Sequence, residues 1–285
     1  MKLRKYKKNK KISLFDCVNM IIMLLLAVVF ILPFWLMLTA SLSDEMALTL
    51  NGLKLWFQGF TIEAYVELFS NSSLVNSLGV TLFVSFATAI LSALVCTGAA
   101  YVLSKKTLAG RKFLSWYFMI PIFFSGGSVP VYLVIRNIGL YDTIWALILP
   151  NVANILNIVL VRNYFYGLPD SLHEAAEIDG ANELQKLIRI YFPLAMPMTF
   201  TIGLMAFVGK WNSWLDSMMY LGVKNEKLWM TQYVLRRMLE DNPQEPSSTS
   251  VKNAAIVVVV LPLILLAPVL HKYFAKGVTA GSVKG

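Results

Sequence analysis

Residues 76–104, NSLGVTLFVSFATAILSALVCTGAAYVLS, run for 29 positions without one charged side chain. An α-helix that rises 1.5 Å per residue needs about 20 residues to cross ~30 Å of hydrocarbon. This stretch is longer than that and rich in Leu, Val and Ala. It therefore predicts a transmembrane helix, and the fold follows from how often the pattern returns.

The pattern returns along the whole chain of 285 residues, which is 57% hydrophobic and only 14% charged, with a mean hydropathy of +0.64. Six windows lack charge: 17–43, 68–104, 113–135, 143–161, 190–209 and 253–270. They are solidly apolar, whereas the strands of a membrane barrel alternate in polarity. We expect an all-α integral membrane protein whose six transmembrane helices lie at about 18–41, 76–104, 113–135, 143–161, 192–212 and 253–270.

The net charge of +9 is concentrated in a few segments. Seven of the 25 basic residues lie in Met1–Asp16, and the 105–112 loop holds four more and no acid. The connectors 44–67 and 136–142 hold one basic residue each. The positive-inside rule then places both termini, including a basic tail at 1–16 and a tail at 276–285, in the cytoplasm. The charge thus indicates membrane topology and no nucleic-acid partner.

No residue pattern indicates catalysis. Cys17 and Cys96 suggest neither a disulfide framework nor a metal site, and His173 and His271 have no plausible base or metal partner nearby in the sequence. A G-x-x-x-x-G-K-[ST] phosphate loop is absent from the sequence. We expect a chain that is not an enzyme, has no cofactor and no bound metal, and draws energy from elsewhere.

The predicted cytoplasmic loop 167–191 separates two apolar windows and contains PDSLHEAAEIDGANE at 169–183. Ser171 and Glu174 have the spacing of a capping box, so a helix should start at Leu172 and end at Gly180. Adjacent alanines predict a bare stripe that another surface could approach, flanked by acids: Ala175 and Ala176 beside Glu174, Glu177 and Asp179. The pattern predicts a helix that docks to another protein. The alternative is an amphipathic surface helix without a partner.

Residues 174–197, EAAEIDGANELQKLIRIYFPLAMP, resemble the signature of membrane subunits of binding-protein-dependent ABC importers. Residues 100–113, 139–150 and 210–220 are similar to the smaller, six-span permease of maltose-type sugar systems. The closing AKGVTAGSVKG at 275–285 looks most like permeases for complex oligosaccharides derived from polysaccharides. The resemblance covers nearly the whole chain. This sequence departs from the family's pattern at its basic N-terminal tail.

The resemblance implies a type I ABC importer permease fold in the plasma (inner) membrane of a bacterium. The implied partners are a homologous six-span permease, two copies of a cytoplasmic ABC ATPase, an extracellular or periplasmic solute-binding protein, and membrane lipid. The implied role is the import of sugars, with complex oligosaccharides as the expected cargo. The residues expected to couple the permease to the ATPase are Glu174, Ala175, Ala176, Asp179 and Gly180.

Two groups of residues are candidates for the translocation pathway. Asn151, Asn154 and Asn157 recur every third residue, which would place three amides on one stripe of a helix. They could line a sugar route or bond neighbouring helices. At the outer end of the fifth span, Trp211, Asn212 and Trp214 could also line the route, or the tryptophans could belong to the interfacial aromatic belt. Lys210 and Asp216 beside them are expected to be solvated flanking charges.

Two other protein classes are alternatives to a permease subunit. An ion-coupled secondary transporter or channel should carry ionisable residues within its spans, and the six windows carry none. A membrane-embedded transferase would need catalytic acids or bases at the outer face, where Asp216 alone is poor support. The sequence favours the permease subunit over both.

Overall fold

The computed structural model describes residues 14–124, 126–223, 225–240 and 248–282, with side chains through Pro268. The predicted tail 1–16 lies almost wholly outside the described residues. The chain divides into two compact units, Met1–Leu68 with Ser248–Val257, and Phe69–Ser247 with Val258–Gly285. The described residues are helical throughout, apart from loops and one isolated bridge between Ser43 and Phe60.

The first unit contains one long apolar helix and short polar elements. Its helices are α1 (Leu14–Ser41), α2 (Glu45–Asn51), most of α3 (Glu63–Ser70) and the start of α15 (Thr249–Ser282). The helix α1 is apolar all round, as expected for a helix in lipid, and buries only its last residues, Thr39, Ala40 and Ser41. The connector after α1 thus contains the two short helices α2 and α3.

The second unit contains the helices that carry the candidate sites. Its elements after α3 are α4 (Ser72–Ser104), α5 (Arg111–Phe123), α6 (Ser128–Asn137), α7 (Ile144–Ile148), η1 (Leu149–Asn151), α8 (Ile155–Tyr166), α9 (Ser171–Ile178), α10 (Glu183–Lys186), η2 (Leu187–Tyr191), α11 (Phe192–Leu194), α12 (Met196–Trp211), α13 (Leu215–Tyr220), η3 (Glu226–Leu228), α14 (Thr231–Leu239) and the remainder of α15.

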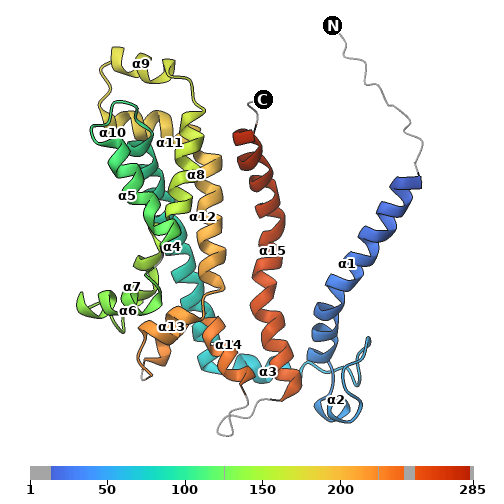
Figure 1. The fold of residues 1–285 in the computed structure, drawn as a ribbon. Coiled ribbons are helices and arrows are strands. Elements are labelled where there is room, and N and C mark those ends of the chain that lie inside the picture. Colours follow the sequence, from blue (N-terminus) through green and yellow to red (C-terminus); the bar gives the residue numbers. More distant parts are fainter. Residues whose placement is uncertain (1–13, 125, 224, 241–247, 283–285) are drawn as a thin grey trace. The chain divides into compact units, whose positions relative to one another are not determined.

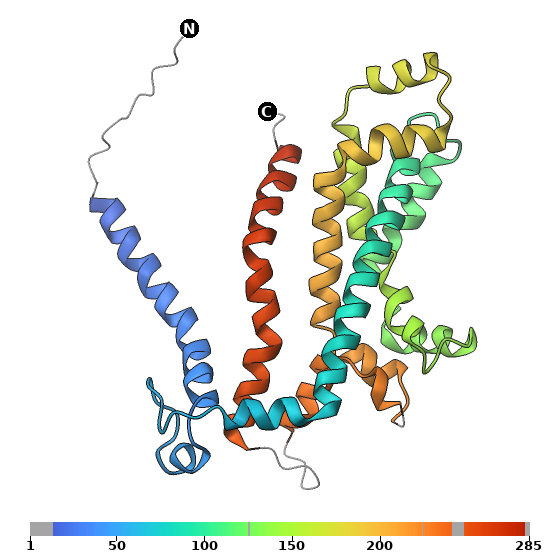
Figure 2. The ribbon, with the colours of Figure 1, turned by 180° about the vertical axis from the view of Figure 1, so that it is seen from behind.

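The long helix α4 is the centre of this unit, because both α8 and α12 pack along it (Figure 1, Figure 2). Half of its twelve buried residues are serines or threonines, which recur at helical spacing: Ser77, Thr81, Ser85, Thr88, Ser92 and Thr97. Small residues let helix backbones approach closely where no hydrophobic effect drives them together. Thr97 bonds Thr199 of α12 across this contact, with 3.1 Å between their hydroxyl oxygens.

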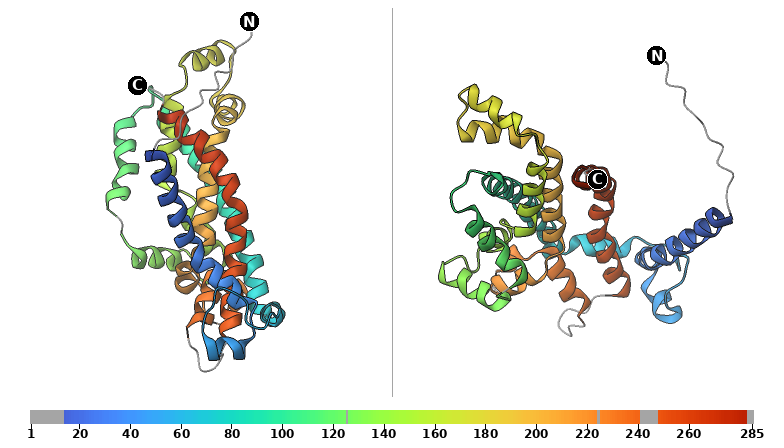
Figure 3. Two further views of the ribbon diagram at one scale, coloured as in Figure 1. Left: turned by 90° about the vertical axis from the view of Figure 1, so that its right-hand side faces the viewer. Right: turned by 45° about the horizontal axis from the view of Figure 1, so that its top comes forward.

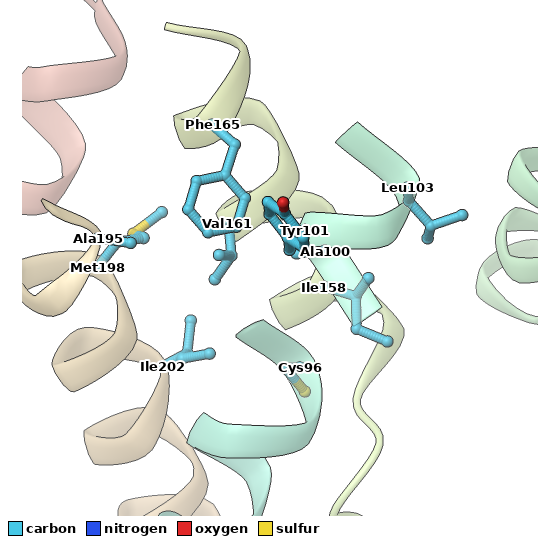
Figure 4. Packing of buried hydrophobic residues seen from close by; sticks show 10 residues of the cluster. All are labelled: Cys96, Ala100, Tyr101, Leu103, Ile158, Val161, Phe165, Ala195, Met198 and Ile202. Atoms are coloured by element: carbon cyan, nitrogen blue, oxygen red, sulfur yellow. The ribbon is translucent and has the colours of Figure 1, made fainter. Parts of the chain in front are cut away.

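A buried apolar cluster joins α4, α8 and α12 near one end of the unit (Figure 4). The rings of Tyr101 and Phe165 meet edge to face with centroids 6.3 Å apart, and Tyr191 lies 4.9 Å from Tyr101 and 5.5 Å from Phe165. Aromatic contacts of this kind add to the free energy gained from burial alone. The cluster therefore ties the segment that follows α9 to the end of α4.

Among the described residues, three helices are individually long and apolar enough to cross a membrane, and they lie within α1, α4 and α15. Three bent pairs of helices would raise the count to six if each is one span. The helices α5 and α6, which form one of these pairs, are separated by a break between Phe123 and Ser128. The helix predicted to begin near Asn76 begins at Ser72, because the Asn71 side chain caps the amides of Ser73 and Leu74.

The fourth and fifth predicted spans are not single helices. Ile144–Asn151 and Ile155–Tyr166 meet at 42°, and Glu183–Leu194 and Met196–Trp211 meet at 79°. The sharper bend falls at Ala195, between Pro193 and Pro197, which both lack a backbone N–H for a regular helix. The segment before this bend includes a π-helical turn, η2, and lies across the end of the helices (Figure 1).

Candidate functional site

The helix α9 stands beyond the ends of the packed helices in every view (Figure 3). It begins at Ser171, and the preceding Asp170 has helical dihedral angles of −62° and −25° and makes no capping hydrogen bond. A capping side chain needs an extended backbone at that position. The predicted capping box of Ser171 and Glu174 and the predicted start at Leu172 are therefore wrong.

Asp170 bonds a residue beyond α4 instead of capping α9. Its carboxylate accepts a hydrogen bond from Lys106 Nζ at 2.7 Å. This hydrogen bond, together with the ammonium charge, holds the pKa of the Asp170 carboxyl below its usual value. The start of α9 is thus linked to the loop that follows α4.

The end of α9 follows the prediction for Gly180, whose φ is +73°. Gly180 N–H donates to the Glu177 carbonyl at 3.0 Å, and Ala181 N–H donates to the Ala176 carbonyl at 2.9 Å. These two bonds form a Schellman motif, in which the left-handed residue satisfies carbonyls at the helix end. A capping box does occur one turn later, where the side chains of Asn182 and Gln185 bond each other's amides. The N-x-x-Q spacing after a glycine was the signal for it.

The two alanines of α9 differ in exposure. Ala175 is exposed, but Ala176 is only 3% exposed, so the predicted bare stripe of both alanines is wrong. The exposed residues at the C-terminal end of α9 are Glu174, Ala175, Glu177 and Ile178, followed by the C-cap Asp179. Ile178 is 87% exposed and was missed by the sequence reasoning. An apolar side chain held so far into solvent beside acids is typical of a surface that another protein covers.

The inner face of α9 is held by a buried lysine. The Lys186 side chain is 3% exposed, and its Nζ lies 2.9 Å from Glu177 Oε1 and 3.3 Å from Glu183 Oε1. The hydrogen bond from Lys186 and its charge lower the pKa of the Glu177 carboxyl. Because Glu177 belongs to α9 and Lys186 to α10, this ion pair fixes the position of α9 on the helix that follows it.

Glu183 extends the network to the end of α4. Its carboxylate accepts a hydrogen bond from Tyr101 Oη at 2.7 Å and forms an ion pair with Lys105. Burial lowers the pKa of the Lys105 ammonium, and the nearby charge of Lys186 lowers it further. The α9 segment is therefore bonded to α4 through charged groups as well as through the aromatic cluster.

His173 takes part in the same network, so the expectation that it has no partner is wrong. Its Nε2 lies 3.1 Å from Glu177 Oε1, and the ligand atoms of His173, Glu177 and Glu183 all lie within 4.8 Å of one another. Three such groups could hold a metal ion. Lys186 Nζ already bonds both carboxylates, however, so the arrangement is an ion-pair network. The side chain of His271 lies outside the described residues.

The three asparagines expected on one helical stripe lie at a break between helices. Asn151 ends η1, and Asn154 precedes α8, where its Oδ1 accepts a hydrogen bond from Asn157 N at 3.2 Å. Asn157 lies in the first turn of α8 and is 4% exposed. The single-stripe prediction is wrong, because asparagine caps helices well and Asn154 starts a new one. All three nevertheless line one cavity of about 260 Å³.

The ion pair of Lys210 and Asp216 lines the same cavity. The prediction that these two residues are solvated flanking charges is wrong. The Lys210 side chain is 1% exposed and the Asp216 side chain 16% exposed, and the two are bonded to each other. Asn151 Nδ2 lies 3.4 Å from Asp216 Oδ2. Sequence reasoning missed the pair because Lys210 stood one residue beyond an uncharged window, although it belongs to α12.

The aromatic residues expected at the route do not line this cavity. Trp211 is fully buried, and its Nε1 donates to the Val259 carbonyl of α15 at 3.1 Å. Asn212 bonds the Val208 carbonyl at the end of α12, at 3.0 Å. The Trp214 ring is covered by the Arg236 guanidinium, 3.9 Å from its centroid. Of the six pathway candidates, the cavity thus brings together the three asparagines.

Comparison with known proteins gives a family model that matches residues 8–280, described as "Binding-protein-dependent transport system inner membrane component". Protein LplC of Bacillus subtilis is 34% identical over 95% of this chain and 95% of its own length. The polygalacturonan/rhamnogalacturonan transport system permease protein YtcP of Bacillus subtilis is 34% identical over 96% of this chain and 100% of its own length.

A trehalose/maltose transport system permease protein, MalG of Thermococcus litoralis, is 30% identical over 92% of this chain and 94% of its own length. Among solved structures, one chain of a bacterial ABC transporter involved in the import of the acidic polysaccharide alginate superposes with a TM-score of 0.85. It is 29% identical, and the match covers 94% of this chain and 99% of that chain.

Proposed function

Since this chain belongs to the family of inner-membrane components of binding-protein-dependent transport systems, we propose that it is a permease subunit of an ATP-driven sugar importer. Complex oligosaccharides derived from polysaccharides are the proposed cargo. Two relatives and the solved neighbour described above carry carbohydrates in their names or titles, and two of these three refer to polysaccharides. The chain forms the route through the membrane together with a second, homologous permease.

The exposed face of α9 is the observation that carries the proposal. Ile178 is held in solvent on a helix whose end is closed by Gly180 and whose inner side is bonded to Lys186. Such a fixed apolar ridge with acids beside it suits a cleft on a cytoplasmic ATPase. Each permease would dock one of two ATPase copies, and the ATPases supply the nucleotide site that this sequence lacks.

The contacts of α9 explain how the ATPase could move the permease. When the ATPase dimer closes, it displaces α9, and the network of Glu177, Lys186 and Glu183 carries that displacement to Tyr101 at the end of α4. The segment α10–η2–α11 carries it to α12. Both α4 and α12 line the asparagine cavity, so nucleotide binding and the route are mechanically connected.

In this proposal Asn151, Asn154 and Asn157 line the sugar route. Their amides offer donors and acceptors to sugar hydroxyls, and an amide at this depth is costly unless a protein group or polar cargo meets it. The protein lies in the plasma (inner) membrane of a bacterium, with both termini and α9 in the cytoplasm. An extracellular or periplasmic binding protein delivers the sugar, and the segment 271–285 reaches the ATPase.

The test is reconstitution in liposomes of stated composition. The chain, its companion permease, the ATPase and the binding protein are purified as one complex through a tag on this chain, and uptake of labelled trigalacturonate and maltotriose is measured. We expect uptake that requires ATP inside and the binding protein outside. Uptake by the chain alone, driven by an ion gradient, would contradict the proposal and support the ion-coupled transporter.

A further inference from the structure

The asparagine cavity has a more specific chemistry than a polar route requires. Its polar groups converge from three segments: Thr88 on α4, the asparagines around the start of α8, and Lys210 and Asp216 around the end of α12. Ser213 is also polar, and the remaining lining residues are Leu156, Met205, Ala206 and Gly209. Polar groups that converge on one cavity fix the orientation of a small molecule and give it specificity.

Burying the ion pair in this cavity costs desolvation free energy, so a contribution to stability does not explain its presence. Lys210 lies in α12 with its side chain 1% exposed, and Asp216 is its charged partner. Replacing a buried ion pair by apolar groups of similar size is often neutral or stabilising. An ionisable residue within a membrane helix is therefore first considered as part of a functional site.

Two buried polar side chains in the lining have hydrogen-bonding capacity left over. Thr88 is 1% exposed, and its Oγ1 has no hydrogen-bond partner among the described residues. Asn157 is 4% exposed, and its backbone N–H donates to Asn154 Oδ1, but the described residues offer no hydrogen bond to its side-chain amide. Buried polar groups are bonded in the great majority of structures. Unmet donors and acceptors that face a cavity point to a polar ligand.

We propose that this cavity is a subsite for one sugar ring of the transported oligosaccharide, and that it recognises neutral ring hydroxyls. This inference rests on the proposed function. Asp216 and the asparagine carbonyl oxygens accept hydrogen bonds from hydroxyls, while Lys210 and the asparagine amide groups donate to hydroxyl oxygens. The apolar atoms of Leu156 and Met205 contact the C–H face of the ring.

Size limits the ligand to part of an oligosaccharide. The cavity volume of about 260 Å³ lies just below the ~300 Å³ at which sites for drug-sized molecules begin. A single ring fits that description better than a whole oligosaccharide. The rest of the sugar chain then lies outside the cavity, in the space that the companion permease shares.

Charge decides between neutral and acidic rings. The cavity contains one ammonium and one carboxylate, so its net charge is zero as long as Lys210 and Asp216 remain paired. A uronate carboxylate in the cavity would compete with Asp216 for Lys210, and separating a buried pair leaves an uncompensated charge. The subsite is therefore expected to favour an uncharged ring, even within an oligosaccharide that carries carboxylates elsewhere.

The experiment measures a ratio of two uptake rates. The probes are trigalacturonate and its fully methyl-esterified form, in which each carboxylate is replaced by a neutral methyl ester. The protein is the complete complex in proteoliposomes. Asp216→Asn leaves Lys210 without its counter-charge, so the acidic-to-neutral uptake ratio should rise by about threefold or more. Lys210→Met leaves Asp216 alone, so the same ratio should fall by about threefold or more.

A matched control comes from the exposed ion pair of α14. Arg236 Nε lies 2.9 Å from Glu240 Oε1, and Glu240 is mostly exposed. Glu240→Gln removes the same charge as Asp216→Asn, and the uptake ratio should stay at the wild-type value. If either buried single variant does not assemble with its partners, Asn157→Asp provides the test, since it adds a negative charge to the intact cavity and should lower the ratio.

The outcomes separate the subsite from the function on which it rests. Opposite shifts of the ratio in the two single variants support the subsite. A purely structural ion pair would lower both uptake rates equally, and an unchanged ratio in every assembled variant overturns the inference while sugar import stands. Wild-type complexes that take up neither probe, nor maltotriose, contradict the proposed function itself.

Discussion

The N–H of Ala181 donates to the carbonyl of Ala176 across 2.9 Å, and this bond closes α9 over Gly180. Ala176 is buried while its neighbour Ala175 is exposed, so the bond also sets which side of the helix faces outward. The proposed docking face thus depends on a backbone turn that only a few residue types can make.

Replacing Gly180 by Val should uncouple ATP hydrolysis from uptake. A left-handed φ of +73° costs a non-glycine residue about 1–2 kcal/mol, and more when it is β-branched. No atom lies within 4 Å of a Cβ added there, so the effect is one of backbone strain. We expect normal membrane insertion and continued ATP hydrolysis with uptake reduced by about tenfold, measured in proteoliposomes.

Gly180→Asn is the matched control, because asparagine tolerates the left-handed region better than other side chains. Its uptake should remain close to the wild-type rate. Wild-type uptake by the Val variant would show that the turn at Gly180 is not needed for coupling.

Ile178→Asp should release the ATPase without unfolding the permease. The side chain is 87% exposed, so its removal takes little from the packing of this chain. Burial of an isoleucine in a partner contributes about 1.5–3 kcal/mol, which corresponds to a tenfold or greater loss of affinity. Copurification of the ATPase with the tagged chain measures this loss of affinity.

The control for Ile178→Asp is Val223→Asp, a similarly exposed apolar position between α13 and η3. It should retain the ATPase. Equal retention by both variants would exclude Ile178 from the docking surface.

Glu45→Gln should weaken the start of α15 in a pH-dependent way. Glu45 Oε1 and Oε2 accept hydrogen bonds from the amides of Thr249 and Ser250, each at 2.8 Å. Burial raises the pKa of the Glu45 carboxyl, but hydrogen bonds from Ser250 and Thr249 outweigh burial and hold the pKa below its usual 4.5. A carboxylate at a helix N-terminus also interacts favourably with the helix dipole.

Because the folded-state pKa is depressed, this stabilisation is present above pH 4.5 and is lost as the pH falls through the folded-state value. At pH 7 the variant should lose about 1 kcal/mol of unfolding free energy in detergent, and the difference from wild type should vanish at low pH. Glu63→Gln, at an exposed carboxylate in α3, is the control. A difference that persists at pH 3 would show that the charge is not responsible.

Two threonines of α4 should respond differently to the same substitution. Thr81 Oγ1 accepts a hydrogen bond from the buried Thr231 N–H of α14 at 2.8 Å, so Thr81→Val leaves that donor unsatisfied. The expected loss is about 1–3 kcal/mol of stability. Thr88→Val removes a hydroxyl that has no partner and should be neutral or stabilising. Thermal unfolding of both variants in the same detergent decides, and equal losses would contradict the assignment.

Local patterns in the sequence were sufficient to predict the helical membrane class and the end of α9. Each depends on residues close together in the chain: uncharged runs long enough to cross a bilayer, and a glycine after a helical segment. The burial of Ala176 could not be predicted in this way, because it depends on which neighbours cover α9.

The site at the asparagines shows the same limit. A spacing of three predicted one helical stripe, but Asn154 caps a new helix, and only the folded chain shows that the break still brings the three side chains to one cavity. The pairing of Lys210 with Asp216 depends on the turn between α12 and α13, which brings the end of one helix to the start of the next. Counting charges along the sequence could not show that these two are buried together.

The wide turn η2 and the bend at Ala195 together form an elbow between α9 and α12. If α9 and α12 were collinear, a displacement of α9 would shift α12 along its own axis. Because the chain bends by 79° between them, the proposed displacement of α9 would instead tilt or twist α12. The displacement at the far end of α12 would then exceed the displacement of the ATPase that causes it.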